Sequence, residues 1–156
     1  MPLLVQALQQ SLASQWLGEN HPDSATESGD RFAGAVSAWF AGAMAATFPC
    51  VTALARRSQL AAAAGAAFEA RDPNLAGQQL ALAVASYIAG QSFPPGAALF
   101  PTALQSATQQ MVAVFSDPGD DVEAKAQDIA AACYALCTST QVAIPVPPGP
   151  PTAPIL

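Results

Sequence analysis

Apolar residues recur along most of the chain at the three- and four-residue spacing of a helix. They form six segments, and proline, glycine or a cluster of polar residues separates each segment from the next. The pattern therefore predicts an all-α fold, a bundle of about six helices. We place these helices at about residues 2–17, 30–47, 48–72, 75–90, 101–116 and 121–138.

The first and last predicted helices each carry one apolar stripe, which is typical of a helix that buries one face. In the first helix the stripe is Leu4, Leu8, Leu12 and Trp16. In the sixth it is Val122, Ala126, Ile129, Cys133, Leu136 and Cys137.

The third segment is rich in alanine, the strongest helix former. One of its faces carries Leu54, Ser58, Ala61, Gly65 and Phe68. Because most of these side chains are small, neighbouring helices can approach closely. We therefore predict that this helix lies in the middle of the bundle.

Two stretches of the chain resemble each other. Residues 35–42 read AVSAWFAG and residues 83–90 read AVASYIAG, and each leads to Phe-Pro, then Thr-Ala-Leu, then a helix that ends before Asp-Pro. The spacing from Trp39 to Tyr87 favours two helical hairpins of about 48 residues, plus one helix around Tyr134 that resembles a shortened third copy.

The chain changes character after Thr140. Residues 141–144 fit a short strand, and the six prolines that follow favour an extended polyproline II arm. We divide the chain into a helical bundle, 1–140, and a Pro-rich C-terminal arm, 141–156. An extended arm loses little entropy on docking, so we expect it to contact neighbouring subunits. The candidate interaction residues are Ile144, Pro145, Val146, Pro147, Pro148, Ile155 and Leu156.

Charge is scarce in this sequence. Only 10% of residues are charged and the net charge is −6, whereas about a quarter of residues are charged in an ordinary domain. A mostly neutral surface suits burial against other subunits, although an alanine-rich composition inherited from a GC-rich genome would also produce it. The scarcity of basic residues argues against binding to nucleic acid or to anionic lipid.

The three cysteines are Cys50, Cys133 and Cys137. Their odd number argues against a disulfide framework and favours a reducing compartment. We interpret them as small buried apolar residues, and we expect no metal and no cofactor.

We consider two groups of polar residues as candidate catalytic or metal-binding sites. His21 and Asp23 would form an acid–base pair, but the loop lacks a nucleophile, so we interpret His21 as an exposed loop residue. The acids of 117–123 lack calcium-loop spacing and fit a turn followed by a helix N-cap. We therefore predict that the protein is not an enzyme.

The chain begins without a positively charged segment, so we do not expect a secretory signal. Residues 32–55 and 74–116 are uncharged, which keeps a small helical membrane protein as an alternative. Ser37, Thr47, Pro49 and Thr52 interrupt the first of these stretches and make a membrane span unlikely.

In overall texture the helical body (about residues 28–138) and its extended tail resemble the small Ala-rich helical virion proteins of tailed bacteriophages, found in neck, tail and baseplate. The resemblance implies a structural subunit of the virion, assembled in the host cytoplasm, whose partners are copies of itself and other structural proteins. It has no diagnostic motif and assigns no residue a role. A small-molecule-binding helical domain is a further alternative.

Overall fold

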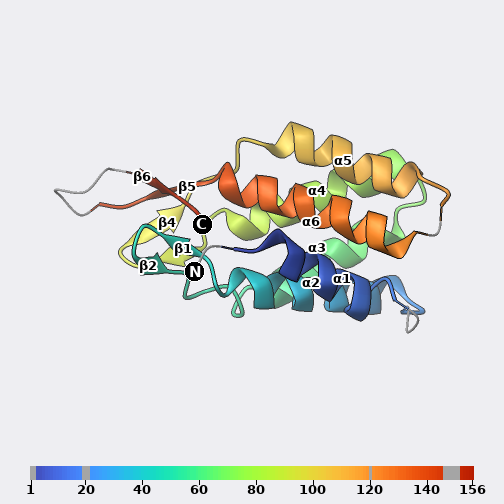
Figure 1. The fold of residues 1–156 in the computed structure, drawn as a ribbon, viewed down its shortest axis with the longest axis horizontal. Helices are drawn as coiled ribbons and strands as arrows, with labels where there is room; N and C mark the ends of the chain where they lie inside the picture. Colours follow the sequence, from blue (N-terminus) through green and yellow to red (C-terminus); the bar gives the residue numbers. More distant parts are fainter. Residues whose placement is uncertain (1–2, 19–21, 120, 146–151) are drawn as a thin grey trace.

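The computed structural model describes residues 3–18, 22–119, 121–145 and 152–156. These residues contain six helices in an elongated bundle, with short strands gathered at one end (Figure 1). The six predicted helices are confirmed, but the bounds of two are wrong: the second begins five and ends seven residues earlier than expected, and the third begins nine residues later. The helices are α1 (Val5–Gln15), α2 (Ala25–Phe40), α3 (Arg57–Glu69), α4 (Pro73–Ile88), α5 (Leu104–Ser116) and α6 (Val122–Thr138).

The all-α class is wrong at the breaks between helices. Within the described ranges these breaks form three antiparallel β-hairpins, because chain that leaves a helix still needs partners for its backbone groups. The strands are β1 (Met44–Ala45), β2 (Phe48–Pro49), β3 (Ser92–Phe93), β4 (Gly96–Ala98), β5 (Gln141–Ala143) and β6 (Thr152–Pro154).

Each hairpin also bonds to the next one. Strand β4 pairs with β5, and the Val51 N–H donates to the Ser92 carbonyl at 3.0 Å. Met44 and Leu156 exchange backbone hydrogen bonds of 3.1 and 2.8 Å, which join β6 to β1. The three hairpins therefore close into a ring, and closure removes the free strand edges that otherwise promote aggregation.

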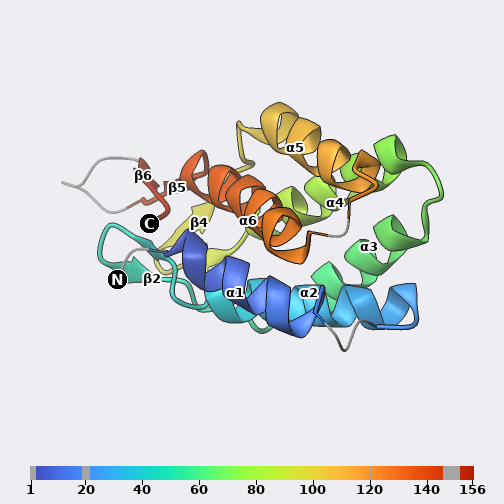
Figure 2. The ribbon, with the colours of Figure 1, turned by 45° about the vertical axis from the view of Figure 1, so that its right-hand side comes forward.

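The helices follow the same threefold plan. Elements α2–β1–β2–α3 and α4–β3–β4–α5 form two units whose boundaries lie about 48 residues apart, as the sequence predicts. The third unit begins with α6, β5 and β6. In the first two units the helix after the hairpin, α3 or α5, closes the unit. In the third unit the closing helix is α1, which packs against α6 as α3 packs against α2 (Figures 1 and 2). The predicted shortened copy is thus completed by the first helix of the chain.

Side chains at matching positions support this assignment of α1. Counting from the first residue of each closing helix, the fourth and eighth positions are fully buried, and the twelfth is aromatic. These positions are Leu8, Leu60 and Ala107, then Leu12, Ala64 and Met111, then Trp16, Phe68 and Phe115. Trp16 stacks on Phe68 with ring centroids 4.9 Å apart, and Phe68 lies 6.1 Å from Phe115.

Two matching glycines let the paired helices touch. A Cβ atom on Gly29 of α2 would lie 2.6 Å from the Gly65 nitrogen of α3. A Cβ on Gly77, at the same place in α4, would lie 2.6 Å from the Val112 Cα of α5. Close approach of small residues, expected around Gly65, therefore occurs in both complete units.

The sequence placed three features incorrectly. The alanine-rich α3 is not the central helix: it packs against α2 and α4, whereas α4 and α6 each pack against three helices. Leu54 is 64% exposed. It lies in the loop between the first hairpin and α3, because that helix begins only at Arg57. Leu4 also precedes its helix and is 61% exposed.

The arm lies on the chain's own ring wherever the structure describes it. The predicted strand at residues 141–144 is β5, and it pairs with β6. Residues 146–151 lie outside the described residues, so contact of the arm with a neighbouring subunit stays a prediction. Within the described ranges, no helix has the length and apolar character needed to cross a membrane.

Candidate interaction surface

Three exposed aliphatic residues occupy the same position in the three hairpins. Val51, Leu99 and Leu156 each follow the second strand, and each donates its N–H to the first residue of the next hairpin. Their exposed fractions are 59%, 48% and 51%. The residue before each of them is buried, which follows from the alternation of side chains along an extended strand.

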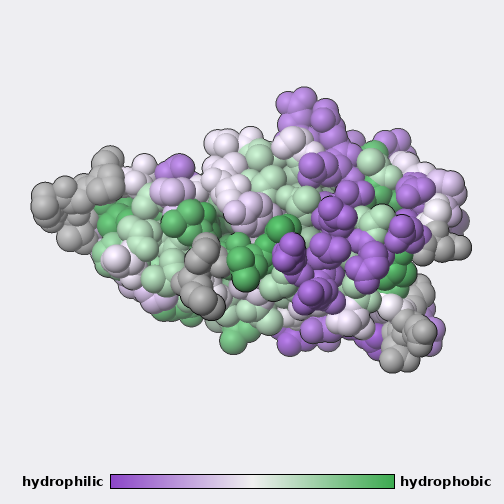
Figure 3. Space-filling model, viewed as in Figure 1, coloured by the Kyte–Doolittle hydropathy of each residue, from purple (hydrophilic) through white to green (hydrophobic). Residues whose placement is uncertain are grey.

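The surroundings of these residues lack charge. Segments 41–55, 89–103 and 139–156, which we call the hairpin end, contain no Asp, Glu, Lys or Arg. Figure 3 shows one face of the molecule, on which hydrophilic residues crowd over the helices while the end with the strands is pale or green. An apolar surface of this kind, rimmed by polar residues, is typical of sites that contact other proteins.

Hydrogen bonds among buried and partly buried polar groups connect the first hairpin to the second and to α4. The Tyr87 hydroxyl donates to the Ala53 carbonyl at 2.7 Å, and burial raises the Tyr87 pKa. The Thr52 hydroxyl donates to the Gln91 side-chain oxygen and accepts from the Ser92 N–H at 2.9 Å. These bonds hold the first hairpin against the second.

Arg56 fixes the start of α3 to the end of α4. Its guanidinium donates to the carbonyl oxygens of Ala89 at 2.6 Å and Ser86 at 3.2 Å. Carbonyls in the last turn of a helix have no partner within the helix, so a cation there satisfies them. Arg56 therefore has a structural role.

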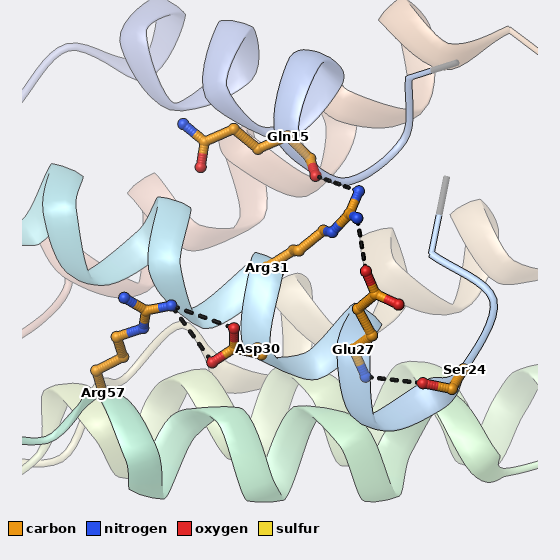
Figure 4. A network of polar contacts seen from close by, with 6 residues as sticks. All are labelled: Gln15, Ser24, Glu27, Asp30, Arg31 and Arg57. Carbon is orange, nitrogen blue, oxygen red and sulfur yellow. Dashed lines mark hydrogen bonds and ion pairs between the residues drawn. The ribbon is translucent and has the colours of Figure 1, made fainter. Parts of the chain in front are cut away.

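Two ion pairs on the outside of the molecule involve α2 and link it to its neighbours α1 and α3 (Figure 4). Arg31 pairs with Glu27 at 2.6 Å and reaches the Gln15 carbonyl at 3.5 Å, while Arg57 pairs with Asp30 at 3.3 Å. Exposed pairs of this kind contribute at most about 1 kcal/mol each. They orient the helices and leave the hairpin end neutral.

A hollow of about 400 Å³ lies among the helix ends away from the ring. Trp16, Phe68 and Phe115 line its apolar part, and Asp23 and Lys125 contribute polar groups. The size suits a small ligand. The hollow contains no pair of side chains arranged as a nucleophile and its base in the part of the chain that is described.

All three cysteines are buried, and burial raises the thiol pKa of two of them. All three are free thiols, and burial raises the Cys133 pKa to about 12. The pKa of Cys137 is also raised, first by burial and then by the neighbouring thiols. A thiol with a raised pKa is a poor nucleophile. The prediction that the cysteines are small buried residues is confirmed.

The acidic candidates have local structural roles. Asp121 caps α6 by accepting from the Ala124 N–H at 3.1 Å, and Asp117 accepts from the Gly119 N–H at 2.9 Å. The prediction of a turn followed by an N-cap is confirmed. Asp23 is exposed, and His21 lies outside the described residues. The described residues hold no cluster of three side chains suited to a metal ion.

The candidate residues of the arm separate into three groups. Ile144 and Ile155 are buried within the ring, while Pro145 and Leu156 are exposed. Val146, Pro147 and Pro148 lie outside the described residues. Sequence reasoning missed Val51 and Leu99, because the longer third connection hides their equivalence to Leu156 from the repeat spacing.

Comparison with known proteins gives no relative from which a role could be transferred. No protein-family model, curated protein or solved structure matches the chain.

Proposed function

We propose that the protein is a non-enzymatic structural subunit that docks onto its neighbours through the hairpin end. The observation that carries the proposal is the set of three exposed aliphatic residues, Val51, Leu99 and Leu156, in segments that contain no charged side chain. The centre of a protein interface is depleted in charged residues. Removing aliphatic side chains from water favours association.

The resemblance in texture to tailed-phage virion proteins suggests where such a subunit acts. We propose a neck, tail or baseplate component, assembled in the host cytoplasm, with copies of itself and other structural proteins as partners.

Charged substitutions at the hairpin end test the proposal. We expect Val51→Asp and Leu99→Asp to weaken self-association about tenfold or more, because a buried carboxylate opposes an apolar contact. The measurement is light scattering after size exclusion over a concentration series. Leu82→Asp is the control, since Leu82 is 50% exposed but lies on α4. Equal association of all three variants and the parent protein would refute docking through this end.

A second candidate function is the binding of a small apolar molecule, favoured by the hollow beside Trp16 and Phe68. The probe is 1-anilinonaphthalene-8-sulfonate, whose fluorescence rises in apolar sites. We expect saturable binding that Phe115→Ala weakens and Leu82→Ala leaves unchanged. Absence of saturable binding would exclude the hollow as a site for this class of molecule.

A further inference from the structure

The third hairpin departs from the other two in its connection. Two residues, 46–47 and 94–95, join the strands of the first and second hairpins, whereas eight residues, 144–151, join β5 to β6. A two-residue turn fixes the second strand beside the first. Five of the eight residues in the longer connection are proline, and proline-rich chain extends about 3.1 Å per residue. Such a connection has a reach of about 25 Å.

The segment after this connection fills a defined slot. Its register against β5 places Ala153 opposite Val142, and Leu156 bonds to Met44 on the other side. Ala153 and Ile155 are buried, with exposed fractions of 4% and 0%. Residues 152–156 therefore complete the ring by backbone pairing on both sides and by two buried apolar side chains.

Nothing in these contacts depends on which copy supplies the segment. The slot consists of β5 and β1, and a segment from either copy can pair with their backbone groups. We propose that residues 152–156 exchange between copies in the assembled state, so that each copy completes the ring of a neighbour. Exchange of an identical element is a low-cost route to association, because it reuses contacts that the single chain already makes.

Concentration decides between the two arrangements. A connection of only eight residues gives the segment an effective concentration in the millimolar range within its own chain, so the closed single chain dominates in dilute solution. Copies held side by side in an assembly reach comparable local concentrations. The inference thus rests on the proposed function in one respect, the presence of adjacent copies.

A pair of introduced cysteines distinguishes exchange from simple docking. Ala143 and Thr152 are Cα partners, and the hydrogen bond from Ile155 to Thr140 places them at a non-hydrogen-bonded pair, where side chains lie close enough for a disulfide. The full-length Ala143→Cys/Thr152→Cys variant is incubated from micromolar to millimolar concentration and then oxidised. We expect covalent dimers and larger species on a non-reducing gel, rising with concentration.

The second hairpin supplies the matched control. Ser92 and Ala97 are also Cα partners at a non-hydrogen-bonded pair, since Ala98 donates to Gln91 at the next pair, and a two-residue turn joins their strands. Their exposure is similar to that of Ala143 and Thr152. The Ser92→Cys/Ala97→Cys variant should form only disulfides within one chain at every concentration. Single-cysteine variants account for random collisions and for the native thiols.

Two outcomes would overturn the exchange. If the Ala143/Thr152 variant is oligomeric by light scattering but its disulfides stay within one chain, docking survives and exchange is refuted. If the variant stays monomeric and forms only internal disulfides at millimolar concentration, both self-association and exchange are refuted.

Discussion

Among single residues, the buried thiols have the clearest measurable effect. Cys133 and Cys137 lie one turn apart in α6, both with at most 1% of their surface exposed. A buried thiolate has no solvation, so the folded protein keeps these groups protonated at a pH where the unfolded chain would release the protons. Their effect on the free energy of unfolding can therefore be measured from its pH dependence.

We expect stability to fall as pH rises above about 9. The pKa of Cys133 is raised from its ordinary value of 9.0 to about 12 in the folded protein, so between these values the folded state binds more protons than the unfolded state. One such group lowers the free energy of unfolding by about 1.4 kcal/mol per pH unit. Urea unfolding between pH 7 and 10.5 measures the slope, which Cys133→Ala should reduce. An unchanged slope would contradict the assignment.

At the scale of elements, the pairing of α2 with α3 depends on a glycine in each helix. The backbone of α3 occupies the space in which a side chain of Gly29 would lie. Gly34, one and a half turns further along α2, faces only the flexible guanidinium of Arg57. Two glycines in one helix therefore have different consequences.

We expect Gly29→Ala to destabilise the protein by about 2–3 kcal/mol, because its Cβ would meet backbone atoms of α3 at 2.5 to 2.8 Å. Gly34→Ala serves as the control and should be neutral or stabilising by up to about 1 kcal/mol, since alanine favours a helix. Urea unfolding followed by circular dichroism gives both values. Equal effects of the two substitutions would argue against the close helix contact.

The helices could be predicted because each carries its own signal. Leu8 and Leu12 recur at helical spacing, and Asp72 with Pro73 marks a turn and the start of α4. The hairpins could not be predicted, because strands of two or three residues are too short to show alternation. Their partners are also distant in sequence, as in the pairing of Ala45 with Ile155.

The candidate surface was only partly visible in the sequence. Leu156 was selected as part of an extended arm, but its equivalence to Val51 and Leu99 depends on ring closure. The echo between residues 35–42 and 83–90 did indicate the repeat. It did not indicate that α1 completes the third unit, because the matching helix lies at the other end of the chain.

At the scale of the whole molecule, the two ends of the chain occupy the place of a loop. Four residues separate Leu99 from α5 in the second unit. If Leu156 were joined to Met1, four residues would likewise separate Leu156 from α1. Figures 1 and 2 show the start of α1 on the side of the ring where the C-terminal end lies.

We therefore expect a circular permutant to fold. In this variant Leu156 is joined directly to Met1, and the chain is opened between Pro118 and Gly119, in the turn between α5 and α6. Its helical content and unfolding midpoint should approach those of the parent protein, as circular dichroism and thermal unfolding would measure. A permutant opened inside α4, between Leu80 and Ala81, should fail to fold. Failure of the first permutant would contradict the threefold plan.

Closure of the ring has a consequence for hydrogen exchange. An open array of repeats frays at its ends, because each terminal repeat has one neighbour. Here α1 of the third unit packs against α2 of the first, and Leu156 pairs with Met44, so each of the three units has a neighbour on both sides. Amide protons of any unit then exchange with solvent only when the contacts on two sides open together. The slowest exchange rates should therefore be shared by all three units, as in a single cooperative block.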